Sequence, residues 1–323
     1  MAEPAPLFGT DRAPVPPGAT AEWFVGAGGA RLRAALFPAL GAARGSVVLS
    51  PGRTEPIEKY FEVAAELTAR GFVVLAHDWR GQGLSQRLLL ERLKGHAVGY
   101  HDVLADYRAL IDTFEARLPA PRLAVGHSMG GGLTALALAK GERRFAAAVL
   151  SAPMFGIFTP PLPPPVTRVL AAALSAAGLG GEVVPGASLT APPEPFETNV
   201  LTHDPARYAR NVEQITLHRD LALGPPTWGW LDFAFAAIAE LRGGAGVAAV
   251  PIPVTVIAAG ADRLVDNRVV RLVTDRFPRG EYIEIAGAHH EILQETDAIR
   301  AVFWREFDAL AGTIFTSPAS PRP

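Results

Sequence analysis

The sequence predicts an α/β fold, in which a mostly parallel β-sheet is flanked by helices and carries an inserted cap. Short apolar runs alternate with helical patterns from about residue 21 onward, which is typical of a parallel sheet covered by helices. Several of these runs are near-continuous Val, Ala, Leu and Ile, as expected for strands buried on both faces. The alternation stops after Ser151 and resumes at Pro251, and the stretch between them is too long for an ordinary connection.

Each expected strand is a short apolar run, and most of these runs are followed by a helical pattern. Between Ile57 and Arg70, for example, Phe61, Ala64 and Leu67 recur at helical spacing. The expected strands are Glu22–Val25, Leu32–Phe37, Ser46–Ser50, Val73–His77, Leu123–Gly126, Ala146–Ser151, Val254–Ala258 and Tyr282–Ile285. The expected helices are Ile57–Arg70, Val103–Arg117, Met129–Lys140, Asn267–Arg276 and Ala298–Leu310.

Changes in composition divide the chain into segments. Residues 1–20 and 313–323 are rich in proline and small residues and are expected to form a flexible leader and a flexible tail. The proline-rich insertion is expected to form a cap or lid over a site, because it follows a strand at the edge where strand C-termini gather. The predicted core therefore has two parts, 21–152 and 247–312, on either side of a cap at 153–246.

Composition excludes several classes of function. The formal net charge is -2, so there is no basic face of the kind that nucleic acid requires. The chain has no cysteine, which rules out disulfides, thiolate metal sites and a cysteine nucleophile. Because the N-terminus does not resemble a signal peptide and no apolar run is long enough to span a membrane, a cytoplasmic protein is expected. Peripheral contact with a membrane surface and the oligomeric state remain open.

A G-x-S-x-G motif places a nucleophile candidate at Ser128. The motif follows a buried strand and precedes a helical stretch, which is the context of the sharp turn that exposes a nucleophilic serine in α/β-hydrolases. Residues two before and two after the serine must be small because the backbones crowd there, and Gly126 and Gly130 meet that need. The following helix directs its N–H groups at the place where an oxyanion would develop.

A serine nucleophile needs a base and a group that orients the base, and in this fold the order along the chain is serine, acid, histidine. Asp262 comes directly after the strand that ends near Ala258, whereas Asp266 could instead cap the next helix. The last expected strand is followed by His289 and His290. Order and position alone do not separate these adjacent histidines.

Four motifs make the chain similar to the lysophospholipase L2 and monoacylglycerol lipase branch of the α/β-hydrolases, and most similar to bacterial lysophospholipase L2. The resemblance extends from about residue 22 to residue 310 and includes two segments of the insertion, Leu201–Tyr208 and Gly224–Trp228. The motifs are Pro51-Gly-Arg-Thr-Glu55, His77-Asp-Trp-Arg-Gly-Gln-Gly-Leu-Ser85, Gly126-His-Ser-Met-Gly-Gly131 and Gly287-Ala-His-His-Glu291.

The resemblance implies roles for individual residues. It makes His290 the base and Asp262 the triad acid, and it assigns the oxyanion hole to the backbone N–H groups of Met129 and Arg53. Where the lipase branch has His-Gly, this chain has Pro51-Gly52, a change that leaves the backbone donor intact and favours lysophospholipase L2.

Two other segments have less direct interpretations. The stretch from Asp78 to Ser85 is expected to pin a loop through hydrogen bonds and not to touch substrate. Trp228 and Trp230 could line an acyl pocket, although aromatic residues of an insertion serve as often in simple packing.

The expected activity is hydrolysis of the acyl ester of a lysophospholipid or similar monoacyl lipid through an acyl-enzyme on Ser128. No metal and no organic cofactor is expected to take part. The alternatives are a monoacylglycerol lipase or general carboxylesterase, a lysolipid acyltransferase, and an aminopeptidase of the same fold. A binding module without chemistry is disfavoured, because such a scaffold has no need of all three triad groups.

Overall fold

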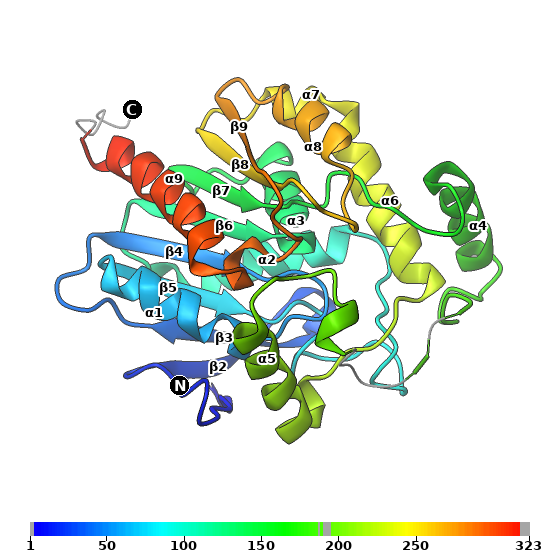
Figure 1. Cartoon of the computed structure of the whole chain (residues 1–323), viewed down its shortest axis with the longest axis horizontal. Coiled ribbons are helices and arrows are strands. Elements are labelled where there is room, and N and C mark those ends of the chain that lie inside the picture. The colour runs from blue at the N-terminus through cyan, green and yellow to red at the C-terminus, as the bar shows by residue number, and fades with distance from the viewer. Residues whose placement is uncertain (1–2, 187, 190–194, 317–323) are drawn as a thin grey trace.

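The computed structural model describes residues 3–186, 188–189 and 195–316. Its centre is one sheet in the order β1-β2-β3-β5-β4-β6-β7-β8-β9 (Figure 1). The described strands are β1 (Glu3–Pro4), β2 (Thr20–Val25), β3 (Arg31–Phe37), β4 (Gly45–Ser50), β5 (Phe72–His77), β6 (Arg122–His127), β7 (Ala147–Ser151), β8 (Val254–Ala259) and β9 (Gly280–Ile285).

The sheet is antiparallel at its N-terminal edge and parallel elsewhere. Strands β1, β2, β3 and β5 pair antiparallel, and every pairing from β5 through β4 to β9 is parallel. All of the strands predicted from the sequence are present, and their ends differ from the prediction by no more than two residues. The predicted fold class is therefore confirmed.

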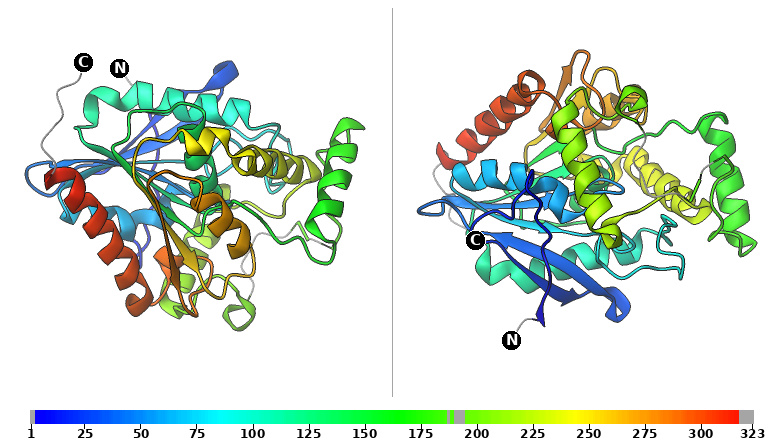
Figure 2. Two further views of the ribbon diagram at one scale, coloured as in Figure 1. Left: turned by 90° about the horizontal axis from the view of Figure 1, so that it is seen from above. Right: turned by 60° about the horizontal axis from the view of Figure 1, so that its bottom comes forward.

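Helices cover both faces of the sheet, as Figure 2 shows. Helices α1 and α9 pack on one face, where Leu67 and Phe307 belong to the same buried cluster. Helices α2, α3 and α8 pack on the other, where Leu110, Leu133 and Val270 share a second cluster. These helices are α1 (Phe61–Ala69), α2 (His101–Phe114), α3 (Met129–Ala139), α8 (Asn267–Thr274) and α9 (Asp297–Thr316).

The insertion forms a helical cap, of which α4 lies farthest from the sheet in each view (Figures 1 and 2). Its last long helix, α6, is buried on two sides. Phe233 and Leu241 belong to the core cluster, whereas Leu231 and Phe235 pack with Ala171 of α4. Thus α6 serves the core as well as the cap. The helices of the insertion are α4 (Pro164–Ala176), α5 (Pro205–Leu217), α6 (Trp228–Gly243) and α7 (Ala245–Ala248).

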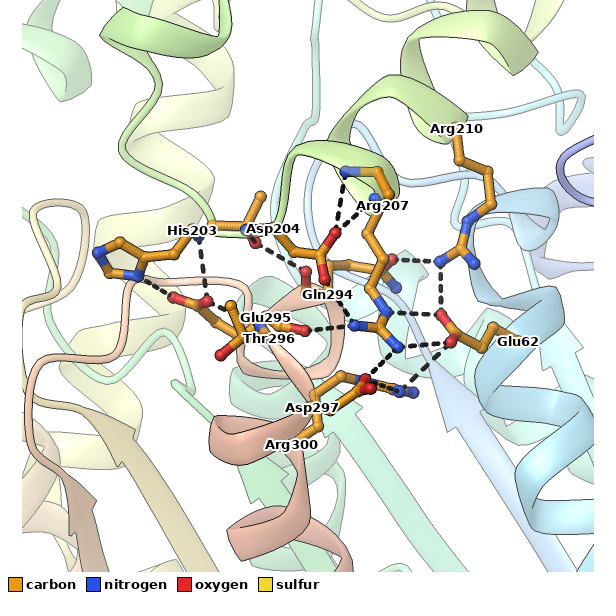
Figure 3. A network of polar contacts seen from close by, with 12 residues as sticks. Glu62, His203, Asp204, Arg207, Arg210, Gln294, Glu295, Thr296, Asp297 and Arg300 are labelled. Carbon is orange, nitrogen blue, oxygen red and sulfur yellow. Dashed lines mark hydrogen bonds and ion pairs between the residues drawn. The ribbon is translucent and has the colours of Figure 1, made fainter.

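Helix α5 is tied to the core by a network of charged side chains (Figure 3). Glu62 of α1 accepts hydrogen bonds from Arg207 at 2.9 and 2.7 Å and from Arg210 at 2.7 Å. Arg207 also donates to Asp297 at 2.7 Å, and Arg300 of α9 reaches Glu62 at 3.3 Å. The cap helix is thereby held between the start of α1 and the start of α9.

The segment before β2 differs from the flexible leader that composition predicts. Glu3 pairs with Trp23 in the sheet, and the Pro6 carbonyl accepts a hydrogen bond from Arg33 at 3.0 Å. Phe8 stacks on His218, the residue that follows α5, with ring centroids 4.3 Å apart. These contacts join distant parts of the chain, so local composition gave no sign of them. At the other end, α9 continues to Thr316, and the rest of the predicted tail lies outside the described residues.

Candidate active site

Ser128 lies at a sharp turn between β6 and α3. Its φ of 51° and ψ of -119° are unusual for a residue with a side chain. A Cβ at Gly130 would lie 2.2 Å from the carbonyl oxygen of Ser50, and one at Gly126 would lie 2.8 Å from the Cα of Gly131. The two glycines therefore permit the turn that presents the serine hydroxyl.

The three residues predicted as a triad lie in one hydrogen-bonded chain. His290 Nε2 is 2.8 Å from Ser128 Oγ, and His290 Nδ1 is 2.7 Å from Asp262 Oδ2. Asp262 follows β8 and His290 follows β9, so neighbouring parallel strands bring them to one edge of the sheet. The imidazole is buried, whereas Ser128 is partly exposed. The order of bonds suits a base that takes a proton from the serine.

The charges around the imidazole favour this arrangement. Burial opposes ionisation of Asp262, but the hydrogen bond from His290 and the backbone N–H groups of Leu264 and Val265 lower its pKa. For His290, burial opposes the charged form, but the hydrogen bond to Asp262 and the nearby carboxylates raise its pKa. Asp266, the other acid considered, caps α8 by accepting from the backbone N–H of Arg268 at 3.0 Å.

His289 points away from this chain of bonds. Its ring stacks on His203, with centroids 3.7 Å apart, and its backbone N–H donates to Glu295 at 2.9 Å. The ligand atoms of His203, His289 and Glu295 lie within 4.8 Å of one another, a spacing that a metal ion could use. However, Glu295 also accepts from the ring and backbone of His203 and from the backbone of Thr296, so its oxygens are already engaged. The cluster ties the cap to the loop of the triad histidine.

The predicted oxyanion donors are two backbone N–H groups, those of Arg53 and Met129. In the part of the chain that the structure describes, neither donates to a protein acceptor. Five polar backbone groups around the Arg53 N–H are, in contrast, engaged. Pro51 O accepts from Trp79, Gly52 N donates to Glu55, Gly52 O accepts from Gln82, Arg53 O accepts from Thr54 Oγ1, and Thr54 N donates to Gln82.

The segment from Asp78 to Ser85 pins its own loop, as expected. Asp78 accepts from Arg33 at 2.7 Å, from the Ile57 backbone at 3.0 Å and from the Leu84 backbone at 2.8 Å. The sequence did not show that Trp79 and Gln82 of this segment also hold residues 51–54, called the oxyanion loop below because they include the predicted donor Arg53. In the sequence, the only indication of this role was that Trp79 and Gln82 belong to the same motif as Asp78 and Ser85.

A buried group of charges lies beside the oxyanion loop. Lys59 donates to Glu55 at 2.8 Å and to Glu291 at 2.6 Å, and Tyr60 donates to Glu55 at 2.6 Å. Burial opposes ionisation of Glu55, but the charge of Lys59 lowers its pKa to about 2. Burial raises the pKa of Glu291. Because Glu55 also binds Gly52, these charges help to set the loop's position.

The two tryptophans of the cap occupy different places. Trp230 lines a cleft beside Met129, together with Gly95 and Gln82. Trp228 is buried against Ala171 of α4 and does not line this cleft. The two side chains leave α6 in different directions, and a role of either tryptophan in an acyl pocket stays a prediction.

The sheet order, the strand–serine–helix elbow and the bonded Ser-His-Asp chain together define a member of the α/β-hydrolase class. Within that class the chain belongs to the family described as "Serine aminopeptidase, S33", which matches residues 41–297. More particularly, it is an enzyme of the lipase and esterase kind, a lysophospholipase or monoacylglycerol lipase-type hydrolase, as the following relatives indicate.

The chain is 36% identical over 269 residues to lysophospholipase L2 of Escherichia coli strain K12, covering 79% of this chain and 77% of that protein. It is 28% identical over 287 residues to the monoacylglycerol lipase of Mycolicibacterium smegmatis, covering 85% of this chain and 91% of the other. A soluble variant of monoglyceride lipase from Saccharomyces cerevisiae shares the fold, with a TM-score of 0.72, 17% identity and coverage of 91% and 96% of the two chains.

No helix among residues 3–186, 188–189 and 195–316 is both long enough and apolar enough to cross a membrane.

Proposed function

We propose that this protein hydrolyses the acyl ester of a lysophospholipid or a similar monoacyl lipid through an acyl-enzyme on Ser128. The observation that carries the proposal is the continuous chain of hydrogen bonds from Asp262 through His290 to Ser128, at 2.7 and 2.8 Å. Among the described residues, two N–H groups stay unengaged, that of Arg53 in the connection after β4 and that of Met129, the first residue of α3.

In the proposed first half-reaction, His290 Nε2 accepts the proton of Ser128 as Oγ attacks the ester carbonyl carbon. The N–H groups of Arg53 and Met129 stabilise the oxyanion, each by on the order of 3 kcal/mol. His290 then protonates the alcohol oxygen as the carbon–oxygen bond breaks, which leaves the acyl group on the serine. In the second half, His290 takes a proton from water, hydroxide oxygen adds to the acyl carbon, and Ser128 recovers its proton as the fatty acid leaves.

The proposed substrate class follows from the relatives and from the oxyanion loop. Among the relatives reported above, the one with the highest identity is a lysophospholipase L2. The Pro51-Gly52 sequence of the loop also favours that group over the lipases. A neutral monoacylglycerol is the alternative substrate. Rates on a lysophospholipid and on a monoacylglycerol of equal chain length, measured in the same mixed micelles, distinguish the two.

Peripheral contact with a lipid surface is part of the proposal. Helix α4 and the residues before it expose apolar side chains, namely Phe158, Leu162, Val166 and Val169, of which Val169 is 64% exposed. A lipid substrate must leave its bilayer or micelle to reach Ser128. An apolar cap surface that contacts the lipid would shorten the path of the substrate through water. We expect Val166→Glu with Val169→Glu to weaken co-sedimentation with phospholipid vesicles and to leave hydrolysis of a short water-soluble ester unchanged. Equal binding of both proteins to vesicles would refute this part.

Replacement of the nucleophile is the test of the proposed activity. Ser128→Ala is expected to abolish ester hydrolysis and covalent labelling by a fluorophosphonate, with no change in circular dichroism. Ser151→Ala is the matched control, because Ser151 is buried at the end of the adjacent strand and its hydroxyl has no partner among the residues that the structure describes. Labelling that persisted in Ser128→Ala, or that was lost equally in the control, would overturn the assignment.

A further inference from the structure

The guanidinium of Arg53 lacks a charged partner. Its one protein acceptor in the described part of the chain is the carbonyl oxygen of Gly224, and its Nε is buried without any partner. No carboxylate of the described residues lies within ion-pair distance of it. Its Cζ lies 5.2 Å from the ring centroid of Trp230, which supplies a weaker, cation–π contact.

An enclosed cation of this kind is costly unless an anion accompanies it. The chain shows the usual solution at Arg33, which is fully buried between Glu58 and Asp78, at 2.7 Å from each. For Arg53, burial lowers the pKa to about 10, and no neighbouring carboxylate opposes that effect. The part of the chain that the structure describes therefore supplies no compensating charge.

The place of the Arg53 guanidinium in the fold, beside the proposed reaction centre, indicates where a compensating anion would bind. The backbone N–H of Arg53 is one of the two unengaged donors beside Ser128, so its side chain begins at the reaction centre. Gly95 permits its approach, because a Cβ there would lie 2.6 Å from Arg53 Nη2. Gly95 and Trp230, the neighbours of the guanidinium, both line the cleft beside Met129. The guanidinium therefore lies next to the wall of this cleft that Gly95 and Trp230 form.

We propose that the Arg53 guanidinium binds the phosphate of the substrate's head group and so gives the enzyme a preference for lysophospholipids over neutral monoacyl lipids. This inference rests on the proposed function. In a lysophospholipid only glycerol carbons and their oxygens separate the ester from the phosphate. One residue can therefore hold the oxyanion through its backbone and the phosphate through its side chain. The planar guanidinium fork matches two phosphate oxygens, which a lysine does less well.

Arg87 provides a matched control. Burial lowers its pKa to about 10 as well, and its Nε is also buried without a partner. However, its terminal nitrogens donate to four carbonyl oxygens, those of Gly81, Gly83, Asp220 and Ala222. It therefore joins the core loop to the cap, as Arg53 does through Gly224, but its terminal nitrogens are engaged by these four carbonyl oxygens.

The experiment measures the ratio of kcat/KM for a lysophospholipid to kcat/KM for a monoacylglycerol. In wild type, Arg53→Gln, Arg53→Lys and Arg87→Gln, kcat/KM is measured for lysophosphatidylglycerol and for a monoacylglycerol of the same acyl chain, in identical mixed micelles. In Arg53→Gln the ratio of the two constants is expected to fall at least about tenfold, with a smaller fall in Arg53→Lys. Arg87→Gln should leave the ratio within about twofold of wild type.

A purely structural role for Arg53 predicts another result, in which kcat/KM falls by the same factor for both substrates and the ratio of the two constants stays unchanged. That result, or an equal change of the ratio in Arg87→Gln, would overturn the inference. If the proposed function itself were wrong, the result would be distinguishable, because wild-type protein would then cleave neither ester.

Free phosphate is tested separately. Inorganic phosphate is added to wild type acting on the monoacylglycerol, and we expect no inhibition beyond that caused by chloride at the same ionic strength. If phosphate inhibited wild type strongly and Arg53→Gln did not respond, the site would belong to a free anion, and the assignment to the lipid head group would be wrong.

Discussion

The side-chain oxygen of Gln82 accepts a hydrogen bond from the backbone N–H of Thr54 at 2.9 Å, and its amide nitrogen donates to the carbonyl of Gly52 at 3.2 Å. One side chain thus grips the residue before and the residue after Arg53. This leaves the Arg53 N–H as the unengaged donor of that short segment among the described residues. The loop that carries the proposed oxyanion donor is held by a residue of another strand connection, that after β5.

Loss of the two hydrogen bonds that Gln82 makes with Thr54 and Gly52 should slow the chemical step. We expect Gln82→Ala to lower kcat by about 10- to 100-fold with a small change in KM, because a displaced donor weakens the transition state more than the bound substrate. Gln86→Ala in the same connection serves as the control, since Gln86 is exposed and bonds to Arg31. Steady-state kinetics on a p-nitrophenyl ester gives both constants. An effect on KM alone would argue against a role in the oxyanion hole.

The pH dependence should follow His290. In the proposed mechanism the neutral imidazole is the base, and its hydrogen bond to Asp262 raises the pKa above the ordinary 6.5 despite burial. We therefore expect kcat/KM to increase with pH through a value above 6.5. Asp262→Asn removes the charge that favours the imidazolium, so the limb should move to lower pH while kcat falls by on the order of 10³- to 10⁴-fold.

The control for the acid is Asp266, which caps α8. Asp266→Asn should keep the wild-type pH profile, because its side chain bonds to Arg268 and not to the imidazole. A profile that shifted equally in both variants would show that the two acids act only through general electrostatics.

The sequence predicted the strands well because burial on both faces leaves a strong signal. The run Val254–Ala259 is wholly buried, and its composition alone marks it as a central strand. The serine and the acid could be predicted because their roles require fixed positions after strands. The choice between His289 and His290, in contrast, depends on ring orientation, which His203 and Glu295 determine from other segments.

The cap was harder to predict for a related reason. Trp228 and Trp230 are two residues apart on a helix, so their side chains leave it about 200° apart. Which of them faces the cleft depends on where α4 and α3 pack, and no local pattern contains that information. The contacts of residues 3–19 with β2 and α5 are likewise long-range, and a composition rich in proline and alanine concealed them.

The buried lysine beside the oxyanion loop should be important for stability. Lys59 lies between Glu55 and Glu291, and all three side chains are at most 10% exposed. Lys59→Met leaves two buried carboxylates without their cation, so we expect a loss of about 3–5 kcal/mol in the free energy of unfolding. Urea denaturation measures it. Lys140→Met breaks the exposed pair with Glu240 and should cost less than about 1 kcal/mol. Equal losses in the two variants would contradict the expectation.

The charged network under α5 predicts how the cap responds to acid. Burial favours the neutral form of Glu62, but the hydrogen bond from Arg207 and the charges of Arg300 and Arg210 lower its pKa to about 2. Because this value lies below the ordinary 4.5, the stabilising effect of the carboxylate is complete above about pH 4.5 and is lost as the pH falls toward 2. Glu62→Gln should abolish the effect at every pH, since a neutral amide does not compensate three guanidinium groups.

The consequence should be local, because Glu62 of α1 joins α5 to the core through its bonds to Arg207 and Arg210 (Figure 3). We expect amide hydrogen exchange in α5 at neutral pH to be about 5- to 30-fold faster in Glu62→Gln than in wild type, with little change in β6 and β7. Glu22→Gln breaks a comparable Glu–Arg pair, with Arg117, far from the cap in sequence and should leave α5 unaffected. If exchange in α5 were the same in Glu62→Gln and wild type, the cap would be held by its apolar contacts alone, and the charges would contribute orientation without stability.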